Sequence, residues 1–256
     1  MRPRKPSHPK ASSAAEQQAS PSYRLPALDS DFLLSDSMRG VRFMLEYAKA
    51  EEALRAAGIR STIVVFGSAR TQPSHRWYVE ARAFGRIASE RGGALDGNGV
   101  VRDNVIATGG GPGTMEAANR GAADVRAPSI GFNIRLPQEQ APNPYSTPEL
   151  TFQFHYFAMR KMHLAMRASG LVVFPGGFGT MDELFEMLTL RQTRKVPLIP
   201  IVLFDREYWT KVINFDALVE AGVIEKKDMK LFAFAQSAEQ VWERLIAGGL
   251  KVPRKK

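Results

Sequence analysis

Apolar residues along this chain fall into two patterns, and the first is a series of short, uninterrupted apolar runs. Such runs are typical of strands covered on both faces, because a strand with one face in solvent alternates apolar and polar residues instead. The predicted strands are Thr62–Phe66, Val105–Ala107, Ser129–Asn133, Leu150–Phe154, Leu171–Phe174 and Leu198–Phe204, and a further apolar run is Leu231–Phe234.

The second pattern spaces apolar residues three or four positions apart, which indicates helices between the strands. The predicted helices are Met38–Ala57, His75–Arg91, Thr114–Val125, Ala158–Ala168, Met181–Arg194 and Ala238–Ala247, with helical material around Tyr208–Val219. Strands that alternate with helices form right-handed parallel βαβ units. We therefore expect an α/β fold: a Rossmann-like, doubly wound parallel sheet with helices on both faces.

Two of the predicted strands lead into nearly the same phrase. The sequence Gly-Gly-Pro-Gly-Thr-Met-Glu occupies 110–116, and Gly-Gly-Phe-Gly-Thr-Met-Asp occupies 176–182. A glycine turn between a strand and a helix gathers free backbone N–H groups and the positive end of the helix dipole, which together bind phosphate. Ligands of doubly wound sheets lie beyond the carboxyl ends of the strands. The two turns therefore predict one crevice for a phosphate-bearing ligand.

These turns do not fit the commoner phosphate-binding motifs. In a dinucleotide-binding fingerprint that starts at Gly111, the third glycine would stand at Glu116, and no acidic residue ends Ser129–Asn133 to hold a ribose. Neither turn contains the Gly-Lys-Ser or Gly-Lys-Thr of a P-loop. Phosphate binding stays predicted, whereas hydride transfer and ATP hydrolysis lose their support.

The basic charge of the chain is concentrated at its ends. Of a formal net charge of +9 over 256 residues, residues 1–30 contribute +3 and residues 251–256 contribute +4. Residues 1–30 are rich in Pro, Ser, Ala and Gln, a composition typical of disorder. We predict a disordered basic tail at 1–30, a single nucleotide-binding domain at 31–250 and a basic tail at 251–256. No specific nucleic acid is expected; a nucleic-acid protein that uses its tails is the weakest alternative.

Composition excludes several classes of site. The chain has no cysteine, which removes disulfides, a thiol nucleophile and cysteine-ligated metal. His155 and His163 have no second ligand at metal spacing, so no metal is predicted. No apolar run approaches the ~18 residues that a membrane span needs. These features predict a cytoplasmic protein with no membrane partner.

Three linked motifs, in order along the chain, resemble those of the LONELY GUY family. Residues 175–183 match its signature Pro-Gly-Gly-x-Gly-Thr-x-x-Glu, Arg160-Lys161 lies upstream at the family's spacing, and 109–119 resembles its first glycine turn. The likeness runs from about residue 62 to about residue 203. The family was once labelled lysine decarboxylase, which implies a pyridoxal phosphate lysine whose context this sequence lacks.

The resemblance implies a nucleoside 5′-monophosphate phosphoribohydrolase. Such an enzyme cleaves the N-glycosidic bond of AMP or of N6-modified AMP, such as a cytokinin riboside monophosphate, to the free base and ribose 5-phosphate. It implies no cofactor and a site near a subunit contact, so we expect a homodimer or a higher homo-oligomer. The alternative from another class is a nucleotide sensor, in which the same crevice binds a nucleotide without cleaving it.

The resemblance makes Glu183 and Arg160 the catalytic residues. A carboxylate at Glu183 would stabilise the oxocarbenium character that develops at the anomeric carbon, and Arg160 would grip ribose or phosphate. Each residue also has a structural interpretation. With Thr180 as N-cap, Glu183 occupies the reciprocal position of a capping box, and Arg160 and Lys161 are an ordinary solvated pair on a helix face.

Other residues are predicted to bind the substrate. Gly176, Gly177, Gly179 and Thr180 would hold the 5′-phosphate, although a tight turn alone also favours glycine. In the first turn, Gly110, Gly111, Gly113 and Thr114 would border the base or ribose. The resemblance adds Lys161, Thr189 and Glu139 as contacts; otherwise the threonine belongs to a helix face and Glu139 to the surface.

Overall fold

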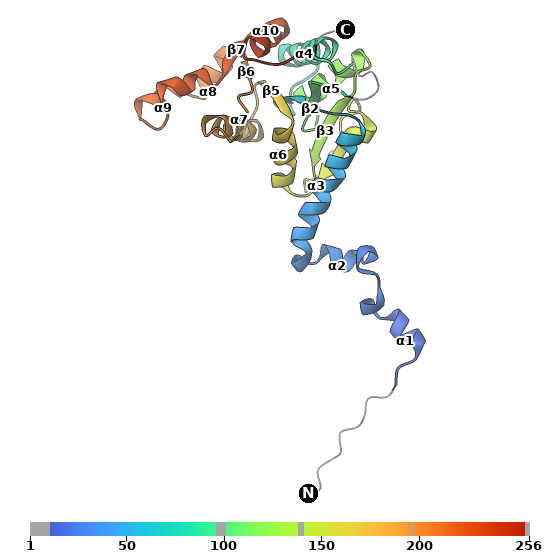
Figure 1. Ribbon diagram of the computed structural model, residues 1–256. Coiled ribbons are helices and arrows are strands. Elements are labelled where there is room, and N and C mark those ends of the chain that lie inside the picture. The colour runs from blue at the N-terminus through green and yellow to red at the C-terminus, as the bar shows by residue number, and fades with distance from the viewer. Residues whose placement is uncertain (1–10, 96–100, 138–140, 196, 254–256) are drawn as a thin grey trace. The chain divides into compact units, whose positions relative to one another are not determined.

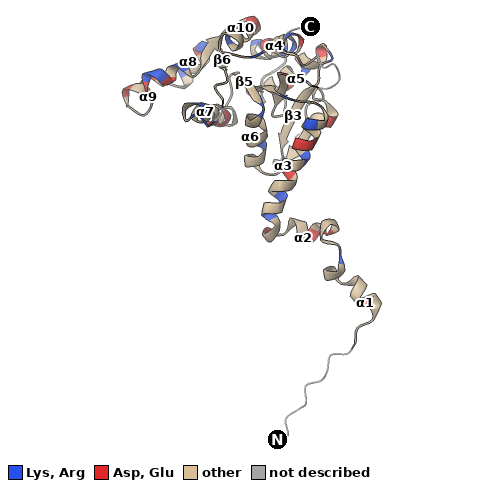
Figure 2. Ribbon diagram, viewed as in Figure 1, with Lys and Arg blue, Asp and Glu red and all other residues tan. Residues whose placement is uncertain are grey.

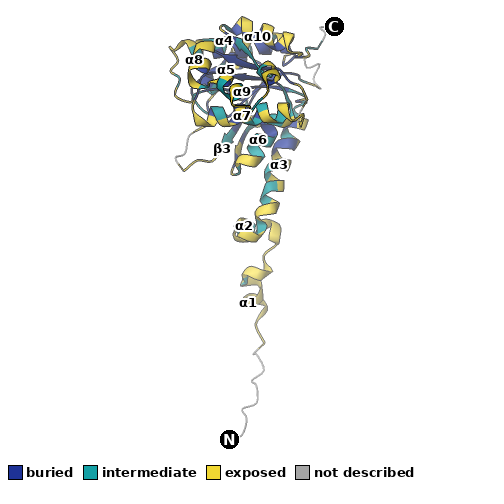
Figure 3. Cartoon of the chain, turned by 90° about the vertical axis from the view of Figure 1, so that its left-hand side faces the viewer, coloured by how far each residue is buried: buried dark blue, intermediate teal, exposed yellow. Residues whose placement is uncertain are grey.

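The computed structural model describes residues 11–95, 101–137, 141–195 and 197–253. The chain divides into two compact units, 1–45 and 46–256, within helix α3 (Arg39–Ala56). The first unit holds the short helices α1 (Ala14–Ala19) and α2 (Ser30–Leu34), neither of which buries a residue. Figure 3 shows these helices largely exposed. The boundaries predicted at 30 and 250 stay predictions.

The second unit is built on a seven-stranded sheet in which every pair of neighbours is parallel. The strand order is β4-β3-β2-β1-β5-β6-β7. The strands are β1 (Thr62–Phe66), β2 (Val105–Thr108), β3 (Ser129–Ile134), β4 (Thr151–Phe154), β5 (Ala168–Val173), β6 (Ile201–Phe204) and β7 (Ala233–Ala235). The predicted Rossmann-like fold is confirmed, and the fully buried β1, β2 and β6 explain the unbroken apolar runs.

Helices cover both faces of this sheet (Figure 1). On one face pack α4 (Arg76–Gly92), α5 (Thr114–Asp124) and α10 (Ala238–Ala247), and on the other lie α6 (Phe157–Met166) and α7 (Phe178–Gln192). The helical material expected around 208–219 forms two helices, α8 (Arg206–Val212) and α9 (Phe215–Glu220). The break between them follows from Ile213, whose backbone is extended, and from Asn214, whose side chain caps α9.

Helices α4 and α5 pack with their backbones in unusually close approach. A Cβ atom on Gly85 would collide with the carbonyl oxygen of Ala118, and one on Gly121 would collide with the carbonyl oxygen of Arg82. Each helix therefore places glycine where the other's backbone passes.

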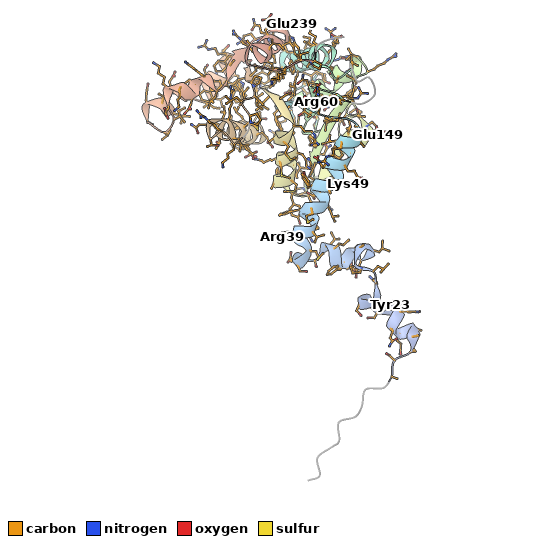
Figure 4. The ribbon with its side chains drawn as sticks, viewed as in Figure 1. Tyr23, Arg39, Lys49, Arg60, Glu149 and Glu239 are labelled. Carbon is orange, nitrogen blue, oxygen red and sulfur yellow. The ribbon has the colours of Figure 1, made fainter. Side chains whose placement is uncertain are left out.

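Helix α4 also contacts α10. Arg91 of α4 donates two hydrogen bonds to Glu239 of α10, at 2.7 and 2.8 Å (Glu239 is labelled in Figure 4). The three helices form one continuous layer.

The chain changes direction at the centre of the sheet. It runs outward from β1 to β4 and then returns to place β5 on the other side of β1, so β1 and β5 flank the switch point. Phe66 and Val173 are paired at the carboxyl ends of these two strands, and beyond them the Ser68 N–H donates to the Pro175 carbonyl at 3.0 Å. The segments after β1 and β5 are thereby held side by side, at the edge where such sheets bind ligands.

Basic and acidic residues are interspersed along α3, as Figure 2 shows. Among the residues that the structure describes, no helix is long and apolar enough to cross a membrane.

One buried carboxylate joins α3 to the start of β5. Glu51 accepts hydrogen bonds from both terminal nitrogens of Arg167 at 2.8 Å each and from Arg55 at 2.6 Å. The Arg167 hydrogen bonds lower the pKa of Glu51 to about 2, against the opposing effect of burial. Because the folded-state pKa lies below the unfolded value, this carboxylate stabilises the fold above pH 4.5, and the effect is lost as pH falls towards 2.

Replacing Glu51 by Gln should therefore lower the free energy of unfolding by about 3 kcal/mol at pH 7. Urea unfolding between pH 7 and pH 3 measures this difference, which should shrink as the pH is lowered. The control is Glu52→Gln on the same helix, whose side chain is exposed and whose effect should stay within about 0.5 kcal/mol. A loss for Glu51→Gln that does not change with pH would contradict the assignment.

Candidate functional site

A cleft of about 600 Å³ opens at the carboxyl ends of β1 and β5. Its walls come from five parts of the fold: the end of β1 with the segment after it, the turn into α7, and single side chains of α6, α5 and α8. The lining residues are Phe66, Gly67, Ser68, Ala69, Arg70, Met115, Arg160, Gly176, Gly177, Phe178, Gly179, Thr180, Met181 and Tyr208. The second glycine turn and Arg160, both predicted from the sequence, thus line the same cleft.

The N-terminus of α7 points its free N–H groups at this cleft. The helix begins at Phe178, its N-cap is Gly177, and no side chain caps it. The first backbone hydrogen bond of the helix is donated by Met181 to the Gly177 carbonyl, which leaves the preceding N–H groups of the first turn for an outside acceptor. The capping-box interpretation of Glu183 is wrong, because Thr180 lies inside the helix and Glu183 stands in its second turn.

The three glycines of this turn serve different purposes. A Cβ on Gly176 would meet the Thr180 side chain and, at 2.9 Å, the backbone nitrogen of Ser68, so Gly176 is required by packing. Nothing lies within 4 Å of a Cβ built on Gly177 or Gly179, and neither has a positive φ. Packing therefore gives no reason for glycine at these two positions, whose open sides face the cleft.

Arg160 and Glu183 meet beside the cleft. Nη2 of Arg160 lies 3.0 Å from Oε1 of Glu183, and the side chains are 12% and 3% exposed respectively. The Arg160 side chain also stacks over the Phe157 ring at 5.2 Å, while its Nε is buried without a hydrogen-bond partner. The arginine reaches the cleft wall, and the carboxylate lies behind it. Two residues that are 23 positions apart in the sequence thus form a direct ion pair.

The pKa of Glu183 is raised from its ordinary value. Burial disfavours the charged form and has the largest effect, while the positive charges of Arg160 and Lys161 act in the opposite direction. The charge of Arg160 is therefore the main influence that opposes this rise in the pKa of Glu183.

Lys161 and Thr189 lie elsewhere. The Lys161 ammonium pairs with Asp182 at 2.7 Å and Glu186 at 3.1 Å; burial lowers its pKa, but these two carboxylates outweigh burial and raise it. Thr189 donates to the carbonyl of Phe185 at 2.8 Å. Both residues line a second groove, of about 480 Å³, over α6 and α7. Within one chain they do not face the cleft of Arg160.

The first glycine turn is incorporated into the scaffold. Gly110 and Gly113 have positive φ values of 71° and 69°, and a Cβ on Gly113 would collide with the carbonyl oxygen of Ser68. The Thr114 N–H donates to that same oxygen at 3.0 Å, and the buried Thr114 hydroxyl lies 3.1 Å from the Thr71 hydroxyl. Of residues 109–116, only Met115 reaches the cleft. Glu139 lies outside the described residues.

Sequence reasoning did not single out several residues of the cleft wall. Ser68 and Arg70 follow the Gly67 that ends β1, a strand-end break of the same kind as the glycine turns. Tyr208 donates from its hydroxyl to the carbonyl of Gly176 at 2.7 Å and so braces the turn. Phe178, 94% exposed, stands at the mouth of the cleft. Only the break after β1 left a signal in the sequence.

Among the described residues, no group of three or more His, Asp or Glu side chains could hold a metal ion. His163 is buried against the rings of Tyr47, Phe132 and Phe154. Neither of its ring nitrogens has a hydrogen-bond partner, and burial lowers its pKa. It packs among these aromatic rings.

A family model described as possible lysine decarboxylase matches residues 115–245. Two cytokinin riboside 5′-monophosphate phosphoribohydrolases of Arabidopsis thaliana, LOG3 and LOG4, are each 26% identical to this chain over 168 residues, which cover 63% of it and 76% of the relative. A third, LOG1, is 31% identical over 88 residues, covering 34% of this chain and 41% of the relative.

One solved structure agrees with the fold. A structural-genomics target superposes with a TM-score of 0.50 at 20% identity, covering 72% of this chain and 96% of that one. A molybdenum cofactor binding protein from Rippkaea orientalis gives a TM-score of 0.48 at 19% identity, with 74% and 95% covered.

Proposed function

The chain belongs to the possible lysine decarboxylase family, to which the LONELY GUY resemblance pointed, and from this premise we propose that it is a nucleoside 5′-monophosphate phosphoribohydrolase. The reaction is hydrolysis of the N-glycosidic bond of AMP or an N6-modified AMP, which releases the base and ribose 5-phosphate. The observation that carries the proposal is the Arg160–Glu183 pair, joined at 3.0 Å next to a cleft with an uncapped helix N-terminus.

The 5′-phosphate binds at the second glycine turn. The unpaired N–H groups of the first turn of α7 donate to its oxygens, and the helix dipole favours its negative charge. The space left open beside Gly177 and Gly179 lets the phosphate approach the backbone. Arg160, on the same cleft wall, binds a phosphate or ribose oxygen with the fork of its guanidinium.

Glu183 acts on the anomeric carbon. As the bond between C1′ and the base nitrogen breaks, positive charge develops on the ribose ring, and the ionised carboxylate stabilises it. Water adds to C1′ and loses a proton, and the base leaves with a proton on its ring nitrogen. Arg160 favours the ionised form of Glu183 and holds the sugar phosphate.

Incubation of the purified chain with AMP tests the proposal. Chromatography should show adenine and ribose 5-phosphate forming in equal amounts, and comparison with N6-modified AMP identifies the preferred base. The competing candidate is a nucleotide sensor, which the burial of Glu183 behind Arg160 favours. Calorimetric binding of AMP with no product after long incubation would establish the sensor in place of the enzyme.

Substitution of the glycines separates binding from packing. Gly177→Ala and Gly179→Ala should each raise KM for AMP by about tenfold or more, because a methyl group enters the space of the phosphate, while Tm stays within a few degrees. Gly176→Ala should lower Tm markedly, since its Cβ collides with Thr180. Unchanged KM in the first two variants would remove this turn from the phosphate site.

We further propose that the enzyme is a homodimer joined through α6 and α7. Large apolar side chains are exposed on and beside these helices: Met166 is 49%, Phe185 39% and Leu198 68% exposed. Lys161 and Thr189 lie in the groove on this side, so a second copy seated there would cover them. Light scattering should give about twice the 28.4 kDa of one chain; a monomer at micromolar concentration would contradict the dimer.

A further inference from the structure

A separate groove, of about 410 Å³, lies between α4 and α5, and its walls are rich in arginine. Arg82 and Arg86 come from α4 and Arg120 comes from α5, while Asp124 is the one carboxylate that lines it. The close packing of the two helices at Gly85 and Gly121 brings these guanidinium groups together. None of these residues lines the cleft of Arg160.

Two of the three arginines are held in fixed positions. Arg82 donates to both oxygens of Asp124, at 2.7 and 2.8 Å, and Arg120 lies over the ring of Tyr145 at 5.2 Å. Arg86 is exposed and reaches its neighbour Glu90 only at 4.0 Å. The hydrogen bond from Arg82 is the main cause that lowers the pKa of Asp124, and the charges of Arg120 and Arg86 lower it further. All three cations therefore surround a single carboxylate.

The charges of the groove do not balance. Among the described residues that line this concave site, three guanidinium groups face one carboxylate, an excess of two positive charges. Glu90, which pairs with Arg86 at 4.0 Å, lies outside the lining. The neighbouring Glu116, which accepts a hydrogen bond from the Tyr78 hydroxyl at 2.7 Å, is not among the residues that line the groove. Charges of one sign in a cleft concentrate counter-ions there. Planar guanidinium forks match the paired oxygens of phosphate and carboxylate groups, which a halide ion lacks.

We propose that the groove between α4 and α5 binds a small phosphate-bearing anion, separately from the nucleotide cleft. Arg86 and Arg120 donate hydrogen bonds to the phosphate oxygens. Arg82 remains paired with Asp124 and contributes its positive charge to the electrostatic attraction. A ligand with at least two negative charges, such as pyrophosphate or the phosphate end of a nucleotide, matches the excess charge of the groove. This site does not depend on the hydrolase proposal, because none of its residues takes part in that reaction.

Calorimetric titration of the full chain with inorganic pyrophosphate, at low ionic strength and without divalent metal, tests the site. The double variant Arg86→Gln/Arg120→Gln should weaken the groove's binding by at least about tenfold. The matched control is Lys211→Gln/Arg244→Gln, which removes the same two charges from exposed positions on α8 and α10 and should bind as wild type does. The single variant Arg86→Gln, at an exposed position, should show an intermediate loss if the double variant folds poorly.

A Gly177→Ala/Gly179→Ala variant separates the two sites. If pyrophosphate also binds in the cleft, this variant loses binding in the cleft and keeps binding in the groove. If pyrophosphate does not bind in the cleft, the wild type shows binding in the groove alone. Pyrophosphate binding that survives in the arginine variant overturns the groove proposal, as does equal weakening in the control. A duplex DNA fragment that binds through Arg86 and Arg120 while pyrophosphate does not bind would also overturn it, in favour of a nucleic-acid surface.

Discussion

Replacing Glu183 by Gln is expected to lower kcat for AMP hydrolysis by about a thousandfold or more and to leave KM within a few-fold of wild type. Gln keeps the size of the side chain and a hydrogen-bond acceptor for Arg160 but removes the negative charge. The charge is needed only when positive charge develops on the ribose ring, so the loss falls on kcat and leaves ground-state binding largely intact. Release of adenine and ribose 5-phosphate measures it.

The matched control for Glu183 lies on the neighbouring position of the same helix. Asp182→Asn also removes one carboxylate from α7, but Asp182 is 54% exposed and pairs with Lys161 outside the cleft. This variant should retain activity within a few-fold of wild type. Melting temperatures of both variants show whether α7 is still formed. A Glu183→Gln protein that folds and turns over AMP at the wild-type rate would end the catalytic assignment and, with it, the hydrolase proposal.

Replacing Arg160 by Gln should reduce kcat/KM by about a hundredfold and move the acidic limb of the pH–rate profile to higher pH. Burial already raises the pKa of Glu183, and Arg160 is the nearest group that lowers it. Without the guanidinium, the pKa of Glu183 rises further, so a higher pH is needed to ionise the carboxylate. Activity falls as the pH decreases through this pKa, because only the ionised form stabilises the transition state.

The conservative variant distinguishes charge from shape. Arg160→Lys keeps the positive charge but loses the planar fork, so its acidic limb should stay nearer to that of wild type while KM for AMP rises. Arg194→Gln, exposed beyond the end of α7, should change neither quantity. The pH profile of kcat/KM between pH 4 and 9 records all three. A profile for Arg160→Gln that loses height without shifting would mean that Arg160 binds substrate but does not control the ionisation of Glu183.

Much of the fold was predictable because its signals are local. The apolar runs at Thr62–Phe66 and Ser129–Asn133 coincide with β1 and nearly with β3, and the predicted helix Ala238–Ala247 is α10. The glycine turns stood where strands end, as predicted. Each of these features is determined by neighbouring residues: the spacing of apolar side chains, and the need for glycine where the backbone turns sharply. The helical material predicted around 208–219 divides into α8 and α9 at an Asn cap that periodicity does not detect.

The roles of individual side chains depended on tertiary structure. Arg160 and Lys161 are adjacent, but successive residues of a helix point about 100° apart, so the arginine lines the cleft and the lysine pairs with Asp182 and Glu186. The two glycine turns look alike in sequence, yet a Cβ on Gly113 would strike the backbone after β1, whereas Gly177 faces open space. These differences arise from contacts between segments distant in the chain.

The sequence by itself determined the βα order, the second glycine turn and the presence of a carboxylate and a guanidinium 23 residues apart. Only the tertiary structure decided that these two groups meet at 3.0 Å beside the turn, that Glu183 is no capping residue, and that three arginines of α4 and α5 share one groove. The physical reason is that secondary structure follows from short-range periodicity and backbone preference. The direction of each side chain, in contrast, is fixed by how each helix is rotated against the sheet and by which distant backbone passes next to it.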